Sequence, residues 1–238
     1  KILVGGVFTN YNGVPANRIA RLNTDGSVDT GFASGSGFSN GGVAVIKVDA
    51  AGEIRIGGSF SGTYNGTDVN RLVLLDGNGV LDPLFDIGSG PSSATVYALA
   101  GSSDNSWYVG GSFSVFDSQN QGRLAKIDAF GTLDIGYLTA GVGFNNSVLK
   151  ILSLPDNKVM AFGSFSKFNG TASSRIARLL ENGTIDPTFN SAGSGADGLI
   201  RNAAIQSDNK IVLVGSFTNY NGTSANRITR ILPDGSVD

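Results

Sequence analysis

The sequence predicts an all-β fold, a β-propeller of four-stranded blades about 52 residues long, from a repeat, its turn chemistry and its strand patterning. Each repeat reads as an apolar run, a Gly-Ser-Phe step, an aromatic-Asn-Gly turn, Arg-Leu or Arg-Ile, then Asp-Gly and a final Asp. It opens at KILVGGVFTNYNG and returns four more times, with anchoring glycines 52 or 53 residues apart at Gly6, Gly58, Gly111, Gly163 and Gly215. Periods of this size mark propellers, solenoids or arrays, whose units bury apolar faces by stacking on neighbours.

Turn chemistry divides the second repeat into four predicted strands, which cover residues 43–48, 53–60, 71–75 and 80–85. Turns at residues 49–52, 64–66 and 76–79 separate them. Asn-Gly and Asp-Gly favour tight hairpins because these residues tolerate positive φ angles. No helical periodicity interrupts this pattern, so every element is expected to be a strand.

Strand patterning favours a propeller over a sandwich. ILVGG, IRIGG, WYVGG, VMAFG and IVLVG are nearly continuous apolar runs, which indicates strands covered on both faces. The neighbouring blades of a propeller provide such cover, and four short strands in about 50 residues suit one blade. A β-solenoid would need shorter coils of about 20 to 30 residues.

The chain is interpreted as one domain of four full repeats and a partial fifth, or as a segment of a larger propeller. The repeat units are 1–52, 53–105, 106–157, 158–209 and 210–238. Both ends fall in mid-blade, so we expect further repeats or domains of the same larger chain as partners.

The repeat "K-I-x-x-G-G-x-F-T-x-Y-N-G … N-R-I-A-R-L-x-x-D-G-S-x-D-x-x-F" resembles the delta-sixty repeat, a bacterial β-propeller repeat of large secreted or surface proteins. The likeness covers the whole chain and is fullest over Lys1 to Phe32. Departures are Phe116-Asp117-Ser118 at the turn of the third unit, Leu74 in place of a basic residue, and an extra Thr63. The resemblance implies the fold, and an architectural or adhesive role without one assigned activity.

Composition restricts the function classes. The net charge is −2 with scattered Lys and Arg, so no basic stripe indicates nucleic-acid binding. The sequence has no membrane-spanning apolar run, and no membrane insertion is expected. Histidine and cysteine are absent, which removes the commonest general bases and nucleophiles. The repeats are also nearly alike, whereas an active site needs asymmetry. We therefore predict that the protein is not an enzyme.

One recurring polar feature is an arginine that stands eleven residues before an aspartate. The sequence predicts structural Arg–Asp pairs within or between blades, which are costly to break because removing one charge leaves the other unpaired. A ring of anion-binding arginines is the alternative. The predicted pairs are Arg18–Asp29, Arg71–Asp82, Arg123–Asp134, Arg175–Asp186 and Arg227–Asp238.

The aromatic-Asn turns are candidate glycan contacts, because rigid rings flanked by amides suit flat polar ligands. The alternative is that each ring caps the end of its blade while Asn-Gly makes the turn. The candidate residues are Tyr11, Asn12, Tyr64, Asn65, Phe116, Phe168, Asn169, Tyr220 and Asn221. A second set of aromatics is expected in the core between blades: Phe8, Phe60, Phe113, Phe165 and Phe217.

No cofactor is predicted. Calcium is kept open at the turns of residues 25–29 and 76–82, although each offers only two or three of the six or more oxygens that calcium takes. The expected function is that of a structural or adhesive module of a large extracellular, cell-surface or virion-associated protein. The alternative is a lectin that binds surface glycans through the turn aromatics.

Overall fold

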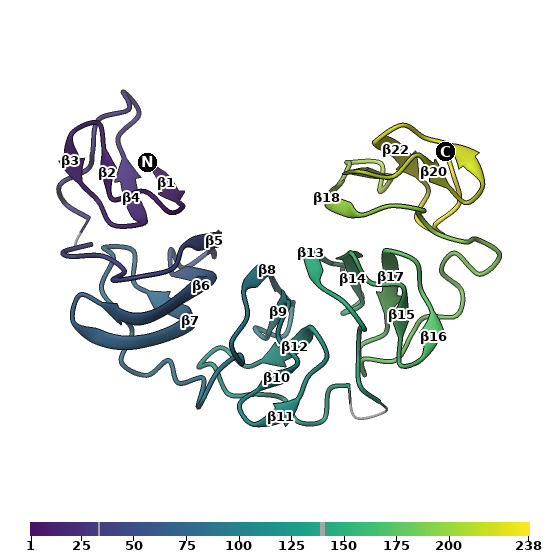
Figure 1. Ribbon diagram of the computed structural model, residues 1–238, viewed down its shortest axis with the longest axis horizontal. Coiled ribbons are helices and arrows are strands. Elements are labelled where there is room, and N and C mark those ends of the chain that lie inside the picture. The colour runs from purple at the N-terminus through teal and green to yellow at the C-terminus, as the bar shows by residue number, and fades with distance from the viewer. Residues whose placement is uncertain (33, 139–140) are drawn as a thin grey trace.

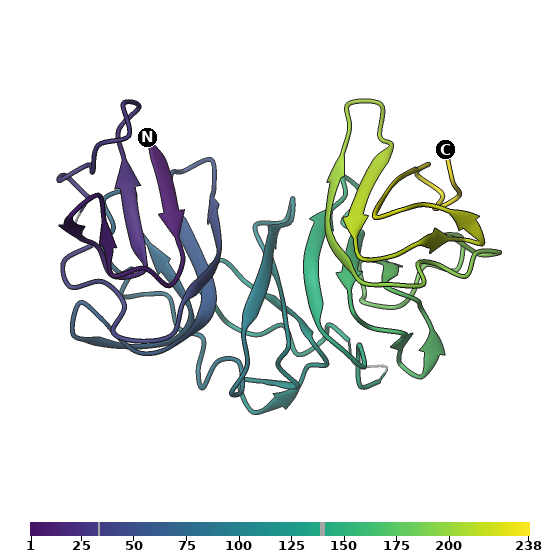
Figure 2. The same ribbon diagram turned by 45° about the horizontal axis from the view of Figure 1, so that its top comes forward.

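The computed structural model describes residues 1–32, 34–138 and 141–238, and the described residues form strands and turns without a helix. Five groups of strands follow one another along an open arc, and the two termini lie in the groups at its two ends (Figure 1). Figure 2 shows the same molecule turned by 45°, with the N-terminal and C-terminal blades on opposite sides of the central one. This arrangement confirms the predicted β-propeller of repeated blades. No helix long and apolar enough to cross a membrane occurs in the described ranges.

Each blade after the first contains a three-stranded antiparallel sheet with its second strand in the middle. The sheets are β5 (Val43–Val48), β6 (Ile54–Tyr64) and β7 (Thr67–Leu75); β8 (Val96–Gly101), β9 (Trp107–Gly111) and β12 (Leu124–Ile127); β13 (Val148–Ser153), β14 (Val159–Gly163) and β17 (Ile176–Leu179); and β18 (Ile200–Ile205), β19 (Ile211–Gly215) and β22 (Ile228–Ile231). The first blade pairs β1 (Ile2–Gly5) with β4 (Ile19–Leu22).

Short hairpins carry the aromatic-Asn-Gly turns. They are β2 (Asn10–Tyr11) with β3 (Val14–Pro15), β10 (Val115–Phe116) with β11 (Gln119–Asn120), β15 (Lys167–Phe168) with β16 (Thr171–Ala172), and β20 (Asn219–Tyr220) with β21 (Thr223–Ser224). In the second repeat the hairpin is instead continuous with β6 and β7, across a register shift between Gly57 and Ser61. The second blade therefore has the longest strands of the described chain.

The strands predicted in the second repeat match the structure unevenly. The first, over residues 43–48, is confirmed as β5, and the next two are longer than predicted. The predicted fourth strand is reduced to the single bridge Leu75↔Leu81. Its pairing ends at once because Asp82 accepts a hydrogen bond from the Leu84 amide, which turns the chain away. The other four blades have equivalent single bridges.

The cores lie between blades, as repeat stacking requires. Met160 and Phe162 of β14 share one apolar cluster with Ile211 and Leu213 of β19 in the next blade. The innermost strands are neighbours too, since β8 contacts both β5 and β13, and β13 contacts β18. The predicted core phenylalanines Phe60, Phe113, Phe165 and Phe217 are at most 1% exposed, and Phe8 in the first blade is half-buried.

Candidate functional site

Aspartates do form ion pairs with arginines in this structure, but the partner is a different arginine from the one predicted. Asp29 pairs with Arg21 at 2.7 Å and Asp186 pairs with Arg178 at 2.9 Å. Asp238 likewise pairs with Arg230. The spacing is eight residues because the aspartate amide donates to the carbonyl of that same residue across the turn, as from Asp186 to Arg178. The predicted eleven-residue pairing is therefore wrong in these three repeats.

In the other two repeats the predicted pairs are also absent. Asp82 and Asp134 form no ion pair among the described residues, and each accepts one backbone hydrogen bond, from Leu84 and Gly136. Lys126, which occupies the Arg21 position in the third repeat, pairs with Asp104 at 2.9 Å instead.

Three of the five arginines predicted to pair donate to backbone carbonyls instead. Arg18 has a φ angle of +70°, and its guanidinium donates to the carbonyls of Gly41 and Phe38 at 2.8 and 2.7 Å. Arg175, with φ +69°, donates to the carbonyls of Ser164 and Phe165. The remaining members, Arg71, Arg123 and Arg227, share the positive φ angle. Arg123 donates to the Phe113 carbonyl at 3.4 Å, whereas Arg71 and Arg227 donate to the side-chain oxygens of Asn70 and Asn226. In the described residues, none of the five forms an ion pair with its predicted aspartate.

The candidate glycan-binding rings are mostly inside the protein. Tyr64, Phe116, Phe168 and Tyr220 are at most 2% exposed, and Tyr11 is half-buried. The hydroxyls of Tyr64 and Tyr220 donate to the carbonyls of Gly79 and Gly235, at 2.7 and 3.0 Å. Burial raises the pKa of both hydroxyls well above the usual value. The prediction of an exposed stacking surface is therefore wrong for these four rings, which cap the ends of their blades.

The turn amides are also used internally. The side-chain oxygens of Asn65, Asn169 and Asn221 accept hydrogen bonds from the amides of Gly37, Gly143 and Gly195 at 2.7 to 2.9 Å. All three asparagines have φ near +50°, as does Asn12. Each side chain thus fixes the loop that leads into its own blade.

The aspartates of the candidate calcium turns accept hydrogen bonds within their turns. Asp25 accepts from the Ser27 amide and hydroxyl, and Asp76 accepts from the Asn78 and Val80 amides. Those bonds hold the turn shape, and the Ser27 hydroxyl and amide lower the pKa of Asp25. No group of three or more His, Cys, Asp or Glu side chains suited to a metal ion occurs in the part of the chain that the structure describes.

One cross-strand position separates the second repeat from the others. In the first repeat Leu3 on the second strand faces Arg21 on the third, and in the fourth Met160 faces Arg178. The third and fifth repeats follow with Tyr108 opposite Lys126 and Val212 opposite Arg230. The second repeat reverses the order, with Arg55 on the second strand and Leu74 on the third.

Arg55 has different partners because of that exchange. Its side chain is 2% exposed, pairs with Asp49 at 2.8 Å, and lies over the Trp107 ring of the next blade at 4.3 Å. It also donates to the Ala129 carbonyl at 3.1 Å. Arg55 therefore ties the second blade to the third from the middle strand of its sheet.

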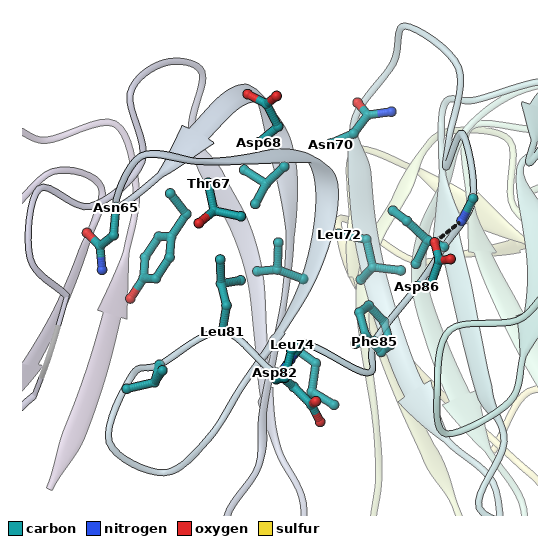
Figure 3. Close-up of a pocket in the computed structure, with 17 residues that line it drawn as sticks. Asn65, Thr67, Asp68, Asn70, Leu72, Leu74, Leu81, Asp82, Phe85 and Asp86 are labelled. Atoms are coloured by element: carbon teal, nitrogen blue, oxygen red, sulfur yellow. Dashed lines mark hydrogen bonds between the residues drawn. The ribbon is translucent and has the colours of Figure 1, made fainter.

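A groove of about 720 Å³ opens beside Leu74, between β7 and the segment of residues 80–88 (Figure 3). Leu72, Leu74, Leu81 and Phe85 supply apolar walls. Carboxylates lie along it at Asp68, Asp82 and Asp86, together with the amides of Asn65 and Asn70, and the residues that line it include no Lys or Arg. We take this groove as the candidate functional site. Sequence reasoning missed it, although Leu74 in place of a basic residue was the signal.

The stacked sheets and their repeated turns define a repeat β-propeller, and comparison with known proteins agrees. The chain belongs to the family described as a β-propeller domain of unknown function, DUF5122. The family profile matches five times, over residues 1–32, 52–85, 102–135, 154–189 and 206–238. Each matched segment contains the second and third strands of a blade and the bridged segment after them.

One solved structure similar to this chain is a protein of unknown function from Bacteroides caccae. It has 14% sequence identity and a TM-score of 0.35, and the match covers 99% of this chain and 90% of that one. No curated protein matches the sequence.

Proposed function

We propose that the chain is a non-enzymatic structural and adhesive module of a larger extracellular, cell-surface or virion-associated protein, and that its repeats are of the delta-sixty type. The observation that carries the proposal is the internal use of the recurring polar side chains. Three turn asparagines hold loops, Arg18 and Arg175 hold backbone carbonyls, and three aspartates hold arginines. Side chains held in this way favour a stiff frame.

A stiff frame suits display. Blades that hold their outer turns in fixed positions let weak contacts add, because each further contact forms within an already bound molecule. The partners that we propose are neighbouring repeats or domains of the larger chain and a surface outside it. A sugar site at the turn aromatics does not belong to the proposal, because four of those rings are buried. The proposal includes no cofactor.

Retention under flow tests the adhesive role. Beads coated densely or sparsely with the 238-residue chain are passed over cell surfaces and over glycan-coated glass, with beads carrying unfolded chain as the control. We expect retention that rises more steeply than coating density, because multivalent contacts multiply affinity. Equal retention of folded and unfolded chain, or no retention at any density, would overturn the adhesive part of the proposal.

A further inference from the structure

In the first and fourth repeats, an arginine stands at the position that Leu74 occupies beside the groove of the second repeat. Arg21 pairs with Asp29, lies over the Phe32 ring with 4.9 Å to the centroid, and donates to the Gly77 carbonyl of the next blade. Arg178 repeats this with Asp186, with the Phe189 ring at 4.9 Å, and with the Pro233 carbonyl at 2.8 Å. We call this set of a carboxylate, a ring three residues later and a carbonyl the arginine socket.

The second repeat keeps two of the three socket elements and lacks the arginine. Asp82 and Phe85 stand at the positions of Asp29 and Phe32, and both line the groove (Figure 3). The Asp82 amide still donates to the Leu74 carbonyl, as Asp29 does to Arg21, so the backbone of the socket is unchanged. Leu74 ends in methyl groups and supplies no cation. The third element, the Ala129 carbonyl, is held by Arg55.

Arg55 does not serve Asp82. Its guanidinium is engaged by Asp49 and Glu53 and by the Trp107 ring. The Asp82 carboxylate accepts one hydrogen bond, from the Leu84 amide, and forms no ion pair among the described residues. The groove thus offers a half-buried carboxylate beside an aromatic ring, with two further carboxylates, Asp68 and Asp86, along its length.

We propose that this groove binds an arginine side chain of a partner polypeptide, which takes the place that Arg21 and Arg178 occupy in their own repeats. A planar guanidinium bonds a carboxylate and stacks on a ring at the same time, which an ammonium group does less well. The net negative lining complements a basic segment, and the volume lies within the range of ordinary ligand pockets. This site and its ligand class are an addition to the proposed structural and adhesive function, which does not depend on them.

The test is an NMR titration of the folded chain with an acetylated, amidated tripeptide Ala-Arg-Ala and its citrulline counterpart. Citrulline keeps the shape of arginine without its charge. We expect the arginine peptide to shift resonances of β7 and of residues 80–88, and to bind about tenfold more tightly than the citrulline peptide, because hydrogen bonds to charged groups are the stronger ones.

Three variants locate the site. Asp82→Asn should weaken binding of the arginine peptide about tenfold, because a charge-assisted bond becomes a neutral one. Asp134→Asn is the matched control, since Asp134 stands at the same position of the third repeat and does not line the groove; it should change affinity less than about twofold. The double variant Arg55→Leu with Leu74→Arg restores the order of the first repeat and should abolish binding by filling the socket from within.

Three results would overturn the inference: no shifts at millimolar peptide, equal affinity for the arginine and citrulline peptides, or equal weakening by Asp82→Asn and Asp134→Asn. If the double variant does not fold, the single substitutions and the citrulline peptide still test whether the groove binds arginine. Failure of this test leaves the bead-retention experiment unaffected, because that experiment measures the whole frame rather than one groove.

Discussion

In the fourth repeat the arginine stands on the third strand, where Arg178 closes on the buried carboxylate of Asp186. In the second repeat the arginine stands on the second strand of the blade, where Arg55 pairs with Asp49. It does not pair with Asp82, the aspartate equivalent to Asp186. Both sheets keep one cation in the same cross-strand pair. The blade therefore tolerates either strand as the source of that cation. The strand alone does not decide whether the outer aspartate is paired, because Lys126 of the third repeat also stands on the third strand but pairs with Asp104 rather than with Asp134.

The largest expected effect concerns what the two repeats share. Phe165→Ala and Phe60→Ala each remove a fully buried ring, at 0% and 1% exposure, and each should cost about 3 to 5 kcal/mol of unfolding free energy. Denaturant unfolding measures both. A difference above about 2 kcal/mol between them would mean that the two cores are not equivalent, and a loss below about 1 kcal/mol would contradict the packing of either ring.

The second largest effect concerns the ion pair between Arg178 and Asp186, which the fourth repeat has and the second repeat lacks. Asp186→Ala should cost about 3 kcal/mol because it leaves the largely buried Arg178 without its partner. Asp82→Ala breaks no ion pair and removes only the acceptor of the Leu84 amide, so it should cost about 1 kcal/mol. Thermal or denaturant unfolding of the two variants makes the comparison.

A double-mutant cycle sharpens this result. Arg178→Ala and Asp186→Ala should be coupled by about 0.5 to 3 kcal/mol, as groups in contact are. Arg175 bonds the carbonyls of Ser164 and Phe165, so the effect of Arg175→Ala should add to that of Asp186→Ala. Coupling to Arg175 and none to Arg178 would restore the eleven-residue pairing and contradict the observed contact.

The same carboxylate should make stability depend on pH. Burial alone would raise the pKa of Asp186, but hydrogen bonds from Thr188 and the Arg178 guanidinium lower it to about 2. A carboxyl with a lowered folded pKa stabilises the protein above the unfolded value of about 3.9, and that contribution is lost as the pH falls toward 2. Between about pH 5 and pH 2 the chain should lose about 2 kcal/mol more than Asp186→Asn does. Identical pH profiles would exclude the linkage.

The smallest effect concerns the turn amides. Asn169→Ala removes the acceptor of the Gly143 amide at 2.7 Å and places alanine at a φ of +47°, so it should cost about 1 to 2 kcal/mol. Asn12, at φ +48°, has no such hydrogen bond in the described residues, and its replacement by alanine should cost about half as much. Equal losses, measured by thermal unfolding, would show that the backbone conformation alone matters.

The fold was largely predictable because the turns of this chain are explicit. Asn-Gly and Asp-Gly pairs at a constant period set the strand boundaries, and β5 lies where the sequence places it. The fourth strand was overpredicted, since apolar residues at Leu81 and Phe85 resemble a strand pattern. Their role is to pack inward on either side of an aspartate turn, and a one-dimensional pattern does not distinguish the two.

The site was less predictable because spacing alone does not say which of two basic residues reaches an acid. Arg18 and Arg21 stand three residues apart. Arg21 reaches Asp29, whereas Arg18, at a positive φ angle, donates to the carbonyls of Gly41 and Phe38. The groove depends on an exchange between neighbouring strands, Arg55 for Leu74. Each residue looks like an ordinary substitution until the register pairs them.

In the described residues every sheet belongs to one blade. Successive blades meet through side chains, a connecting segment and single backbone hydrogen bonds, such as that from the Asp86 amide to the Phe130 carbonyl, rather than through strand pairing. A molecule built this way should respond to tension in steps. Pulled from its ends, each blade would peel from its neighbour and unravel while the rest keep their shape, because each unit depends only on adjacent ones. The chain would then lengthen under load by releasing one blade at a time, which would let it absorb mechanical work before it breaks.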